Sequence, residues 1–315
     1  MKRTKNGVIQ LCVLAALGGS VVLTLLLPGI TARSRRPEPL EVSVVMRQTD
    51  NRLWAGLRMG MEQASSDLGV ELRFLTPETD NDPAAQEALL RREAQRGTDA
   101  MVVLPADTAR LQSRKAELVG EIPLVTLESE TDPEVPAVSP DNALLGEALA
   151  QLALEDSDGR TVLLMNNCPS SDGAALRAER ARLVLQQAGV AVESWPSSRY
   201  ADLDELVVAC DVEQIIAVEA ASTLMLAEKY ADIPGHPQLY GVGTAAAITA
   251  ALDSGTLSGV AAWSEYAAGY LAVEQAAPAA RGKEHRATEP LRFTVVREEE
   301  MYEPENQKLL FPLIS

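Results

Sequence analysis

The stretch Glu41–Leu75, EVSVVMRQTDNRLWAGLRMGMEQASSDLGVELRFL, contains one complete unit of the fold. It begins with an apolar, β-rich run over Glu41–Arg47 and ends with a second such run over Val70–Leu75. Between the two runs, apolar residues recur at helical spacing: Leu53, Leu57, Met61, Ala64 and Leu68. Gly69 follows the last of them and is a typical helix stop. The stretch therefore predicts a strand, a helix and a second strand of a parallel sheet.

The same alternation continues along the rest of the chain. Further strands are expected at Ala100–Leu104, Pro123–Leu127, Thr161–Met165, Val190–Glu193, Gln214–Val218, Gln238–Val242, Ser258–Ala262 and Leu291–Val296. The main helices are expected at Asp82–Gly97, Thr108–Val119, Asp141–Glu155, Ser171–Gly189, Ala245–Ser254 and Glu265–Ala280. Apolar strands that alternate with helices indicate an α/β protein with parallel sheets covered on both faces. Because the pattern restarts at Asp141, it predicts two doubly wound lobes, whose strand ends face each other across a cleft.

Charge and composition exclude several classes of function. The chain of 315 residues has 28 Lys and Arg against 45 Asp and Glu, a formal charge of −17. Residues 1–36 hold six basic residues and no acid, which leaves 22 basic and 45 acidic residues, a charge of −23, in residues 37–315. So acidic a segment repels a phosphate backbone, and we expect no nucleic-acid partner. Three cysteines and two histidines are too few for a disulfide scaffold or a zinc cluster.

The N-terminal segment, residues 1–36, is predicted to be a membrane anchor or a signal segment. Gly7–Ala32 contains no charged residue and is long enough to span a bilayer. We favour an uncleaved anchor that holds the acidic remainder of the chain outside the cytoplasm. A cleaved signal peptide is the alternative, because Ile30–Ala32 ends the stretch in small residues. Arg33–Leu40, with two prolines, is expected to be a short extended linker.

The order and spacing of several segments are more specific than any one of them. They are VSVVMRQTDNRLWAGLRMGMEQASSDLGVELRFLTPET (Val42–Thr79), RREAQRGTDAMVVLP (Arg91–Pro105), IPLVTLES (Ile122–Ser129), SPDNALLG (Ser139–Gly146), GVGT (Gly241–Thr244), LDSGTLSGVAAWSEYAAGYLAVE (Leu252–Glu274) and ENQKLLFP (Glu305–Pro312). Taken together they resemble the type I periplasmic sugar-binding proteins, the substrate-binding components of ABC transporters, over about residues 41–315. The resemblance implies two lobes joined by a hinge of three chain crossings, near Pro140, Trp263 and Leu291. One lobe would comprise residues 37–140 with 264–290, and the other residues 141–263 with 291–315.

The resemblance also implies which residues face the cleft, because each loop that follows a strand contributes to it. These residues are Asp50, Asn51, Trp54, Glu128, Ser129, Asp141, Arg177, Arg180, Glu219, Gly243 and Trp263. Two departures from the family pattern are Glu128-Ser129, where Asp-Arg is usual, and Gly241-Val242-Gly243, where Gly-Phe-Asp is usual. These changes favour a ligand other than a simple monosaccharide, although the two tryptophans suit a ring or a cation.

Several of these residues also have an ordinary structural explanation. A carboxylate at a strand end, such as Asp50, Glu128, Asp141 or Glu219, is often a helix cap. All four in one cleft would favour a hydroxyl-rich or cationic ligand and disfavour an anion. Trp54 and Trp263 are core or hinge residues in the alternative interpretation, and one or both of Arg177 and Arg180 are surface charges. Trp195 is expected to be structural.

Catalysis is not expected, and neither is a cofactor. His236 lies in a proline-flanked turn and His285 in a polar stretch, and neither is near a nucleophile. Cys168 ends a strand and is expected to be an unreactive thiol, without a disulfide to Cys210. The predicted function is therefore delivery of a small, sugar-like ligand to a membrane permease. A tethered sensor that partners a receptor or histidine kinase is the alternative.

Overall fold

The computed structural model describes residues 17–18, 40–196, 203–283 and 289–311, and its first elements form the predicted unit. Strand β1 (Leu40–Val45) pairs in parallel with β2 (Val70–Leu75). Between them lie a short 3-10 helix, η1 (Asn51–Trp54), and helix α2 (Ala55–Leu68). Gly69 ends α2 in the left-handed conformation, with φ of 65°, which a glycine adopts without strain.

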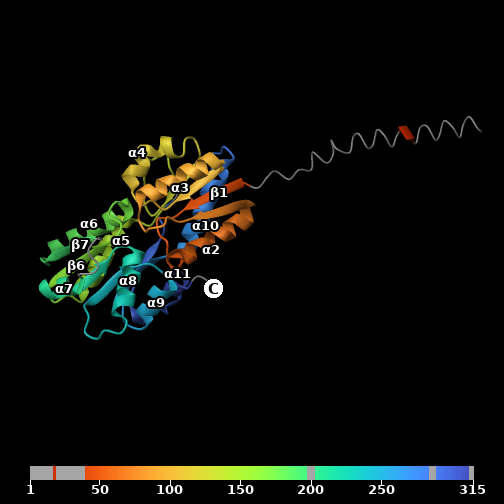
Figure 1. Cartoon of the computed structure of the whole chain (residues 1–315). Coiled ribbons are helices and arrows are strands. Elements are labelled where there is room, and N and C mark those ends of the chain that lie inside the picture. The colour runs from red at the N-terminus through yellow and green to blue at the C-terminus, as the bar shows by residue number, and fades with distance from the viewer. Residues whose placement is uncertain (1–16, 19–39, 197–202, 284–288, 312–315) are drawn as a thin grey trace, which may run out of the picture. The chain divides into compact units, whose positions relative to one another are not determined.

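The first sheet has five parallel strands in the order β2-β1-β3-β4-β5. The elements that complete it are α3 (Pro83–Arg96), β3 (Ala100–Val103), α4 (Thr108–Leu118), β4 (Leu124–Leu127) and β5 (Ala137–Val138). The strands β3 and β4 are buried throughout, as their apolar composition predicts. Helices lie along this sheet (Figure 1), and the α/β class and the doubly wound pattern are confirmed for this part of the chain.

The second sheet has six strands in the order β11-β10-β9-β8-β6-β7. Its elements are α5 (Asn142–Glu155), β6 (Thr161–Asn166), α6 (Asp172–Gln187), β7 (Val192–Pro196), α7 (Leu203–Ala209), β8 (Val212–Ala217), α8 (Ala220–Tyr230), β9 (Gln238–Val242), α9 (Ala246–Asp253), β10 (Gly259–Trp263) and β11 (Phe293–Val296), followed by η3 (Glu298–Glu300) and α11 (Pro304–Leu310). All its pairs are parallel except β10–β11. The expectation of a purely parallel sheet was therefore wrong at this edge. Between β10 and β11 the chain passes through helix α10 (Glu265–Ala280), which packs on α2 beside the first sheet, so the chain comes to β11 from the first lobe.

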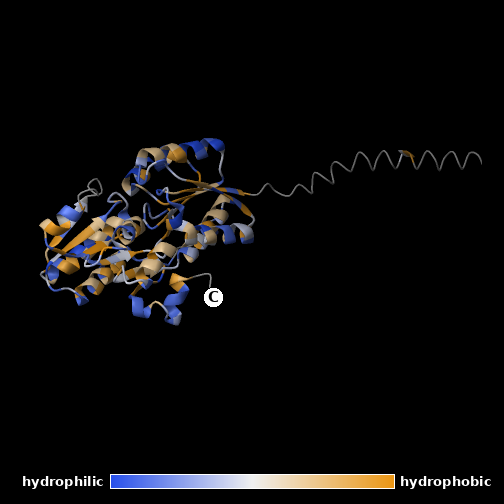
Figure 2. Ribbon diagram, turned by 60° about the horizontal axis from the view of Figure 1, so that its bottom comes forward, coloured by the Kyte–Doolittle hydropathy of each residue, from blue (hydrophilic) through white to orange (hydrophobic). Residues whose placement is uncertain are grey.

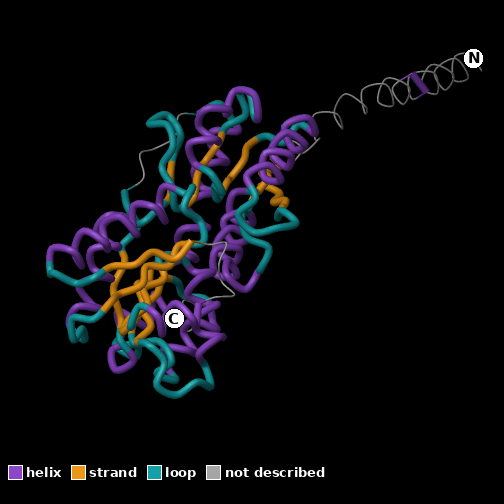
Figure 3. The backbone as a smooth tube through the Cα atoms, turned by 60° about the vertical axis from the view of Figure 1, so that its left-hand side comes forward, coloured by secondary structure: helices purple, strands orange, loops and turns teal. Residues whose placement is uncertain are grey.

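The chain passes between the two sheets at three places. It leaves the first sheet after β5, where Pro140 forms an isolated bridge with Leu291. It returns after β10, where Ser264 caps helix α10 (Glu265–Ala280) by accepting a hydrogen bond from the backbone of Ala267. It crosses again near Leu291, whose backbone N–H donates to Ser139. Figure 3 shows the strands gathered in two groups, with helices around each group.

Apolar side chains of both sheets and of their helices form the core. Strands with fully buried apolar residues run through the interior, and the helices carry polar residues on their outer sides (Figure 2). Trp195 on β7 is 3 % exposed and belongs to the largest buried cluster, in agreement with its expected structural role.

The predicted membrane segment, residues 7–32, lies outside the described residues apart from Leu17 and Gly18. Among the residues that the structure describes, no helix has both the length and the apolar character needed to cross a bilayer.

Helices α2 and α10 pack closely because each presents a glycine to the other. A Cβ atom on Gly60 would lie 1.9 Å from the carbonyl oxygen of Tyr266, and one on Gly269 would lie 1.9 Å from that of Leu57. Such distances cannot be accommodated unless the helix backbones separate. This contact holds α10, which follows the second crossing, against the first sheet.

We expect Gly60→Ala to destabilise the protein by at least about 1–3 kcal/mol, although alanine favours a helix, because the added methyl group forces the two helices apart. Chemical denaturation measures the change in the free energy of unfolding. Ser66→Ala, at an exposed position of the same helix, is the control and should change stability by less than about 0.5 kcal/mol. Equal effects of the two substitutions would contradict the close packing.

Candidate functional site

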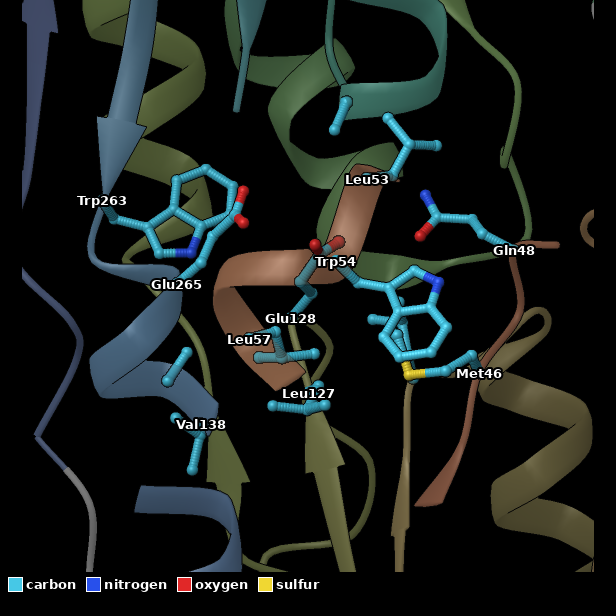
Figure 4. A pocket seen from close by; sticks show the side chains of 13 residues that line it. Met46, Gln48, Leu53, Trp54, Leu57, Leu127, Glu128, Val138, Trp263 and Glu265 are labelled. Carbon is cyan, nitrogen blue, oxygen red and sulfur yellow. The ribbon is translucent and has the colours of Figure 1, made fainter. Parts of the chain in front are cut away.

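A small cavity lies where the strand ends of the two sheets meet. Its volume is about 30 Å³, room for about two water molecules and not for a sugar ring. The residues shown around it in Figure 4 are Met46, Gln48, Leu53, Trp54, Leu57, Leu127, Glu128, Val138, Trp263 and Glu265. They come from the last residues of β4, β5 and β10, from the loops after β1 and β4, and from the helices η1, α2 and α10. In doubly wound folds, ligands bind at the carboxyl ends of the strands. In this structure the space at those ends is therefore nearly closed.

Glu128 joins the two lobes through its carboxylate. The Nη2 atom of Arg47 donates to Glu128 Oε2 at 2.9 Å, and Nη2 of Arg177 lies 3.8 Å from the same oxygen. Arg47 follows β1 and Glu128 follows β4, both in the first sheet, whereas Arg177 lies on α6 beside the second sheet. Burial opposes ionisation of Glu128 most strongly, but the two guanidinium groups outweigh it and lower the pKa of the carboxyl. The backbone of Glu128 is left-handed, with φ of 60°, which is uncommon for a residue other than glycine.

Arg177 is fully buried and is held from several sides. Its Nε atom donates to Asn142 Oδ1 at 2.7 Å, and its Nη1 atom donates to the carbonyl oxygen of Val218 at 3.1 Å. The guanidinium lies 5.0 Å from the ring centre of Trp263, a cation–π contact. Asn142 also donates from Nδ2 to the carbonyl oxygen of Glu128, at 2.8 Å. This network holds Arg177 behind the cavity wall, against Glu128 and Trp263, while burial and Arg47 together lower its pKa from the ordinary range.

Three of the four predicted carboxylates cap helices. Asp50 accepts from the backbone of Arg52 and pairs with its guanidinium at 2.6 Å. Asp141 accepts from the backbone of Leu144 at the start of α5. Glu219 accepts from the backbones of Ala221 and Ser222 at the start of α8, and from the Ser222 hydroxyl. Because their oxygens are engaged in this way, the four carboxylates do not form a joint acidic site.

The remaining predicted residues divide between the cavity and its surroundings. Trp54 and Trp263 line the cavity, each 5 % exposed, and Trp54 also stacks on Phe74 with ring centres 5.7 Å apart. Four predicted residues lie away from the cavity wall: Asn51, Ser129, Arg180 and Gly243. Asn51 is exposed, and Arg180 is 43 % exposed and lies 3.6 Å from Glu147.

Two of these four have clear local roles. The hydroxyl of Ser129 is 2.9 Å from that of Ser171 and accepts from the backbone of Gly173. Gly243 has φ of 120°, which other residues rarely adopt. Both residues therefore position the loops that surround the cavity.

Sequence reasoning missed three polar residues of the site. Arg47, 1 % exposed, follows an apolar strand, and Gln48 comes directly after it. Glu265 opens α10, accepts from the backbone N–H of Thr244 at 3.3 Å and lies against Gly56. Arg47 could have been identified as a site residue because it is a charged residue directly at the end of a buried strand. Glu265 could have been identified because it is an acid directly after the second crossing.

Cys168 and His236 have ordinary structural surroundings. Cys168 is buried, its Sγ atom lies 3.6 Å from the carbonyl oxygen of Ala106, and burial raises the pKa of its thiol. Cys168 and Cys210 are both free cysteines. His236 lies in a turn beside Tyr230, and His285 is outside the described residues. Within the described ranges, no group of three or more His, Cys, Asp or Glu side chains is placed to hold a metal ion.

Several direct hydrogen bonds connect the lobes around the cavity. The backbone N–H of Thr108, at the start of α4, donates to the carbonyl oxygen of Ser170 at 2.9 Å. The Thr108 hydroxyl accepts from the backbone of Asp172 at 3.0 Å. Asn81 Nδ2 donates to the carbonyl oxygen of Asn167 at 3.1 Å. The structure is thus a closed arrangement, in which the first sheet's loops contact those of the second.

Glu265 makes stability depend on pH. Burial, to which Glu128 adds, raises the pKa of its carboxyl to about 7 from 4.5, and the hydrogen bond from Thr244 does not compensate. Between pH 4.5 and 7 the native state therefore holds a proton that the unfolded state has lost, and stability falls as pH rises through this window. We expect Glu265→Gln to become more stable than the unmodified protein by up to roughly 3 kcal/mol over this interval.

Denaturation curves from pH 4 to 8 measure this difference. Glu274→Gln, at an exposed position of the same helix, is the matched control and should run parallel to the unmodified protein. If the stability of Glu265→Gln also changed with pH in parallel to that of the unmodified protein, the raised pKa of Glu265 would be contradicted.

Comparisons with known proteins agree on the fold. Residues 42–284 match the family model described as periplasmic binding protein domain. A carbohydrate-transporter solute-binding protein from Agrobacterium radiobacter, solved with D-arabinose, has a TM-score of 0.77 and 17 % identity, over 87 % of this chain and 99 % of that chain. An ABC transporter solute-binding protein from Agrobacterium vitis, bound with α-D-tagatopyranose, has a TM-score of 0.76 and 19 % identity, over 86 % and 99 % of the two chains. No curated protein sequence matches. Because the family model spans most of the chain, the protein belongs to the periplasmic binding protein domain family.

Proposed function

We propose that this chain is an extracytoplasmic solute-binding protein that closes two lobes on a small, sugar-like ligand and delivers it to an ABC transporter. The observation that carries the proposal is the cavity between the strand ends of the two sheets, with two tryptophans and several polar side chains at its wall. Related structures were solved with D-arabinose, α-D-tagatopyranose and D-fucose. A binding role, rather than a catalytic one, agrees with the family.

The residues at the cavity suit the recognition of a sugar ring. Trp54 approaches from the first sheet and Trp263 from the second, so that an apolar ring face can stack on an indole. Gln48, Glu128 and Glu265 offer hydrogen-bonding groups at the same wall. Aromatic area with a few fixed polar groups is typical of small-molecule sites.

Ligand entry requires the lobes to separate. The cavity has room for only about two water molecules, and the loops of the two sheets are hydrogen-bonded directly to each other. Opening at the three crossings would release these contacts, and closure on a ligand would restore them, as in hinge motions of binding proteins. We place the lobes at residues 37–140 with 264–290 and at residues 141–263 with 291–315.

The N-terminal segment would keep this protein at its transporter. The uncharged stretch Gly7–Ala32 supports anchoring in the cell membrane, with residues 41–315 outside the cytoplasm. Removal of the segment by a signal peptidase would instead release a free binding protein.

A thermal-shift assay tests the binding function. A ligand that binds only the native state stabilises the protein by about 2.7 kcal/mol at 100 times its Kd. We expect at least one member of a panel of sugars and sugar acids to raise the unfolding temperature. Amino acids and polyamines serve as the comparison set. A panel in which no sugar or sugar acid shifts the transition would argue against the proposal.

Closure can be tested at Thr108, whose hydroxyl contacts the other lobe. We expect Thr108→Val to weaken binding of the panel ligand by about 2- to 10-fold, because the closed state loses one hydrogen bond while the side-chain volume is kept. Isothermal titration calorimetry measures the affinity. Ser113→Ala, which removes an exposed hydroxyl from the same helix, should leave it unchanged. An unaltered affinity in Thr108→Val would mean that this contact is not part of the ligand-bound state.

A further inference from the structure

Buried hydrogen-bond donors without acceptors lie at the cavity, on Trp54 in its wall and on Arg47 and Arg177, which contact the wall residue Glu128. Among the described residues, Nε and Nη1 of Arg47, Nη2 of Arg177 and Nε1 of Trp54 are buried and make no hydrogen bond. The side chains of Arg47 and Arg177 are 1 % and 0 % exposed. Leaving a buried donor unpaired costs more when the group is charged, and folded proteins rarely do so. Donors of this kind suit a ligand group that is rich in acceptor atoms.

The carboxylates that the structure describes around these donors are engaged elsewhere. Glu219 is engaged at the start of α8, and Asp141 at the start of α5. Glu265 accepts from Thr244. Turning any of them toward the arginines would break a helix cap or a contact between the lobes. Glu128 alone serves both guanidinium groups, one hydrogen-bonded and the other 3.8 Å away.

The position of Glu128 indicates what kind of group fits there. Its Oε2 atom lies between a guanidinium of the first lobe and one of the second. Its side chain is 22 % exposed and lines the cavity, so it has room to withdraw when the lobes open. A carboxylate from outside can then make the same two contacts, in the geometry that arginine favours.

We propose that the ligand is a sugar acid, a uronate or aldonate, whose carboxylate replaces that of Glu128 between Arg47 and Arg177. This inference rests on the proposed binding function and names the ligand class of the same site. The ring of the ligand stacks on Trp54 or Trp263, and one of its hydroxyls accepts from the donors of Arg47 that remain. A cationic ligand is disfavoured, because two buried guanidinium groups would repel it.

The test compares each neutral sugar with its own acid on the full-length chain. The pairs are D-galactose with D-galacturonate, D-glucose with D-glucuronate and D-arabinose with D-arabinonate, titrated by calorimetry at pH 7. We expect the acid to bind at least about 10-fold more tightly than its neutral partner in at least one pair, because hydrogen bonds between charged groups are stronger.

Substitutions of Arg47 and Glu128, with Arg180 as a control, separate the roles of the charged side chains. Arg47→Gln should weaken binding of the acid by at least about 10-fold, whereas Arg180→Gln, exposed on the same helix as Arg177, should leave it unchanged. Glu128→Gln should keep or strengthen binding of the acid, because it removes the internal competitor. Circular dichroism without ligand verifies that each variant is folded, and the sugar pairs test the idea on the unmodified protein.

The outcomes distinguish this inference from the proposed function. A neutral sugar that binds more tightly than its acid, with binding weakened by Glu128→Gln, would overturn the sugar-acid assignment and leave the sugar-binding function in place. Failure of every neutral sugar and every acid to bind would overturn the proposed function itself.

Discussion

The arrangement of the two lobes depends on one buried ionic contact, in which Glu128 faces Arg47 within its own lobe and Arg177 across the cleft. Burying these three charges is costly, and apolar residues of similar size would often be as stable or more so. The cluster therefore contributes little to stability as such. The cluster instead specifies how the two lobes are arranged. In a low dielectric, any arrangement in which one guanidinium group no longer contacts the Glu128 carboxylate is costly. It also sets the polarity of the site, since the tryptophans and Gln48 are placed around it.

Helix starts explain why an acidic protein has buried arginines with unbonded donor atoms beside its cleft. In both lobes the loops after the strands lead into helix N-termini, whose free N–H groups attract carboxylates. Asp50, Asp141 and Glu219 are engaged in this way, each with its own helix. Their charges are compensated locally, while Arg47 and Arg177 keep donors that no protein group satisfies. A charge of −23 over residues 37–315 therefore describes the surface and says little about the site.

The sequence predicted most of the fold because its strands are short apolar runs and its helices have a clear period. It could not predict that β11 is antiparallel, because direction depends on where the chain enters the sheet and leaves no trace in composition. At the site, Trp54, Glu128 and Trp263 line the cavity as expected for cleft residues, and helix caps were the recognised alternative for the acids. Arg177 and Arg180 stand one turn apart, and only packing against Asn142 and Trp263 distinguishes the buried one. Arg47 was missed because a charged residue after a strand is ordinarily solvated.

The closed arrangement has a consequence for affinity. When only a fraction of the molecules is open, the apparent Kd rises by the inverse of that fraction. Contacts between the lobes, such as Thr108–Ser170 and Asn81–Asn167, stabilise the closed state and would form again when the lobes close on a ligand. Glu128 lowers the affinity, because it occupies the position between the two guanidinium groups and competes with whatever binds there. A hydroxyl is a weak competitor for a carboxylate at such a position, since the arginines form stronger hydrogen bonds to an ionised acceptor. An entering carboxylate exchanges one ion pair for an equivalent one and leaves the released Glu128 free to return to water as the lobes open. Selection for an acid thus follows from the same contact that joins the two lobes.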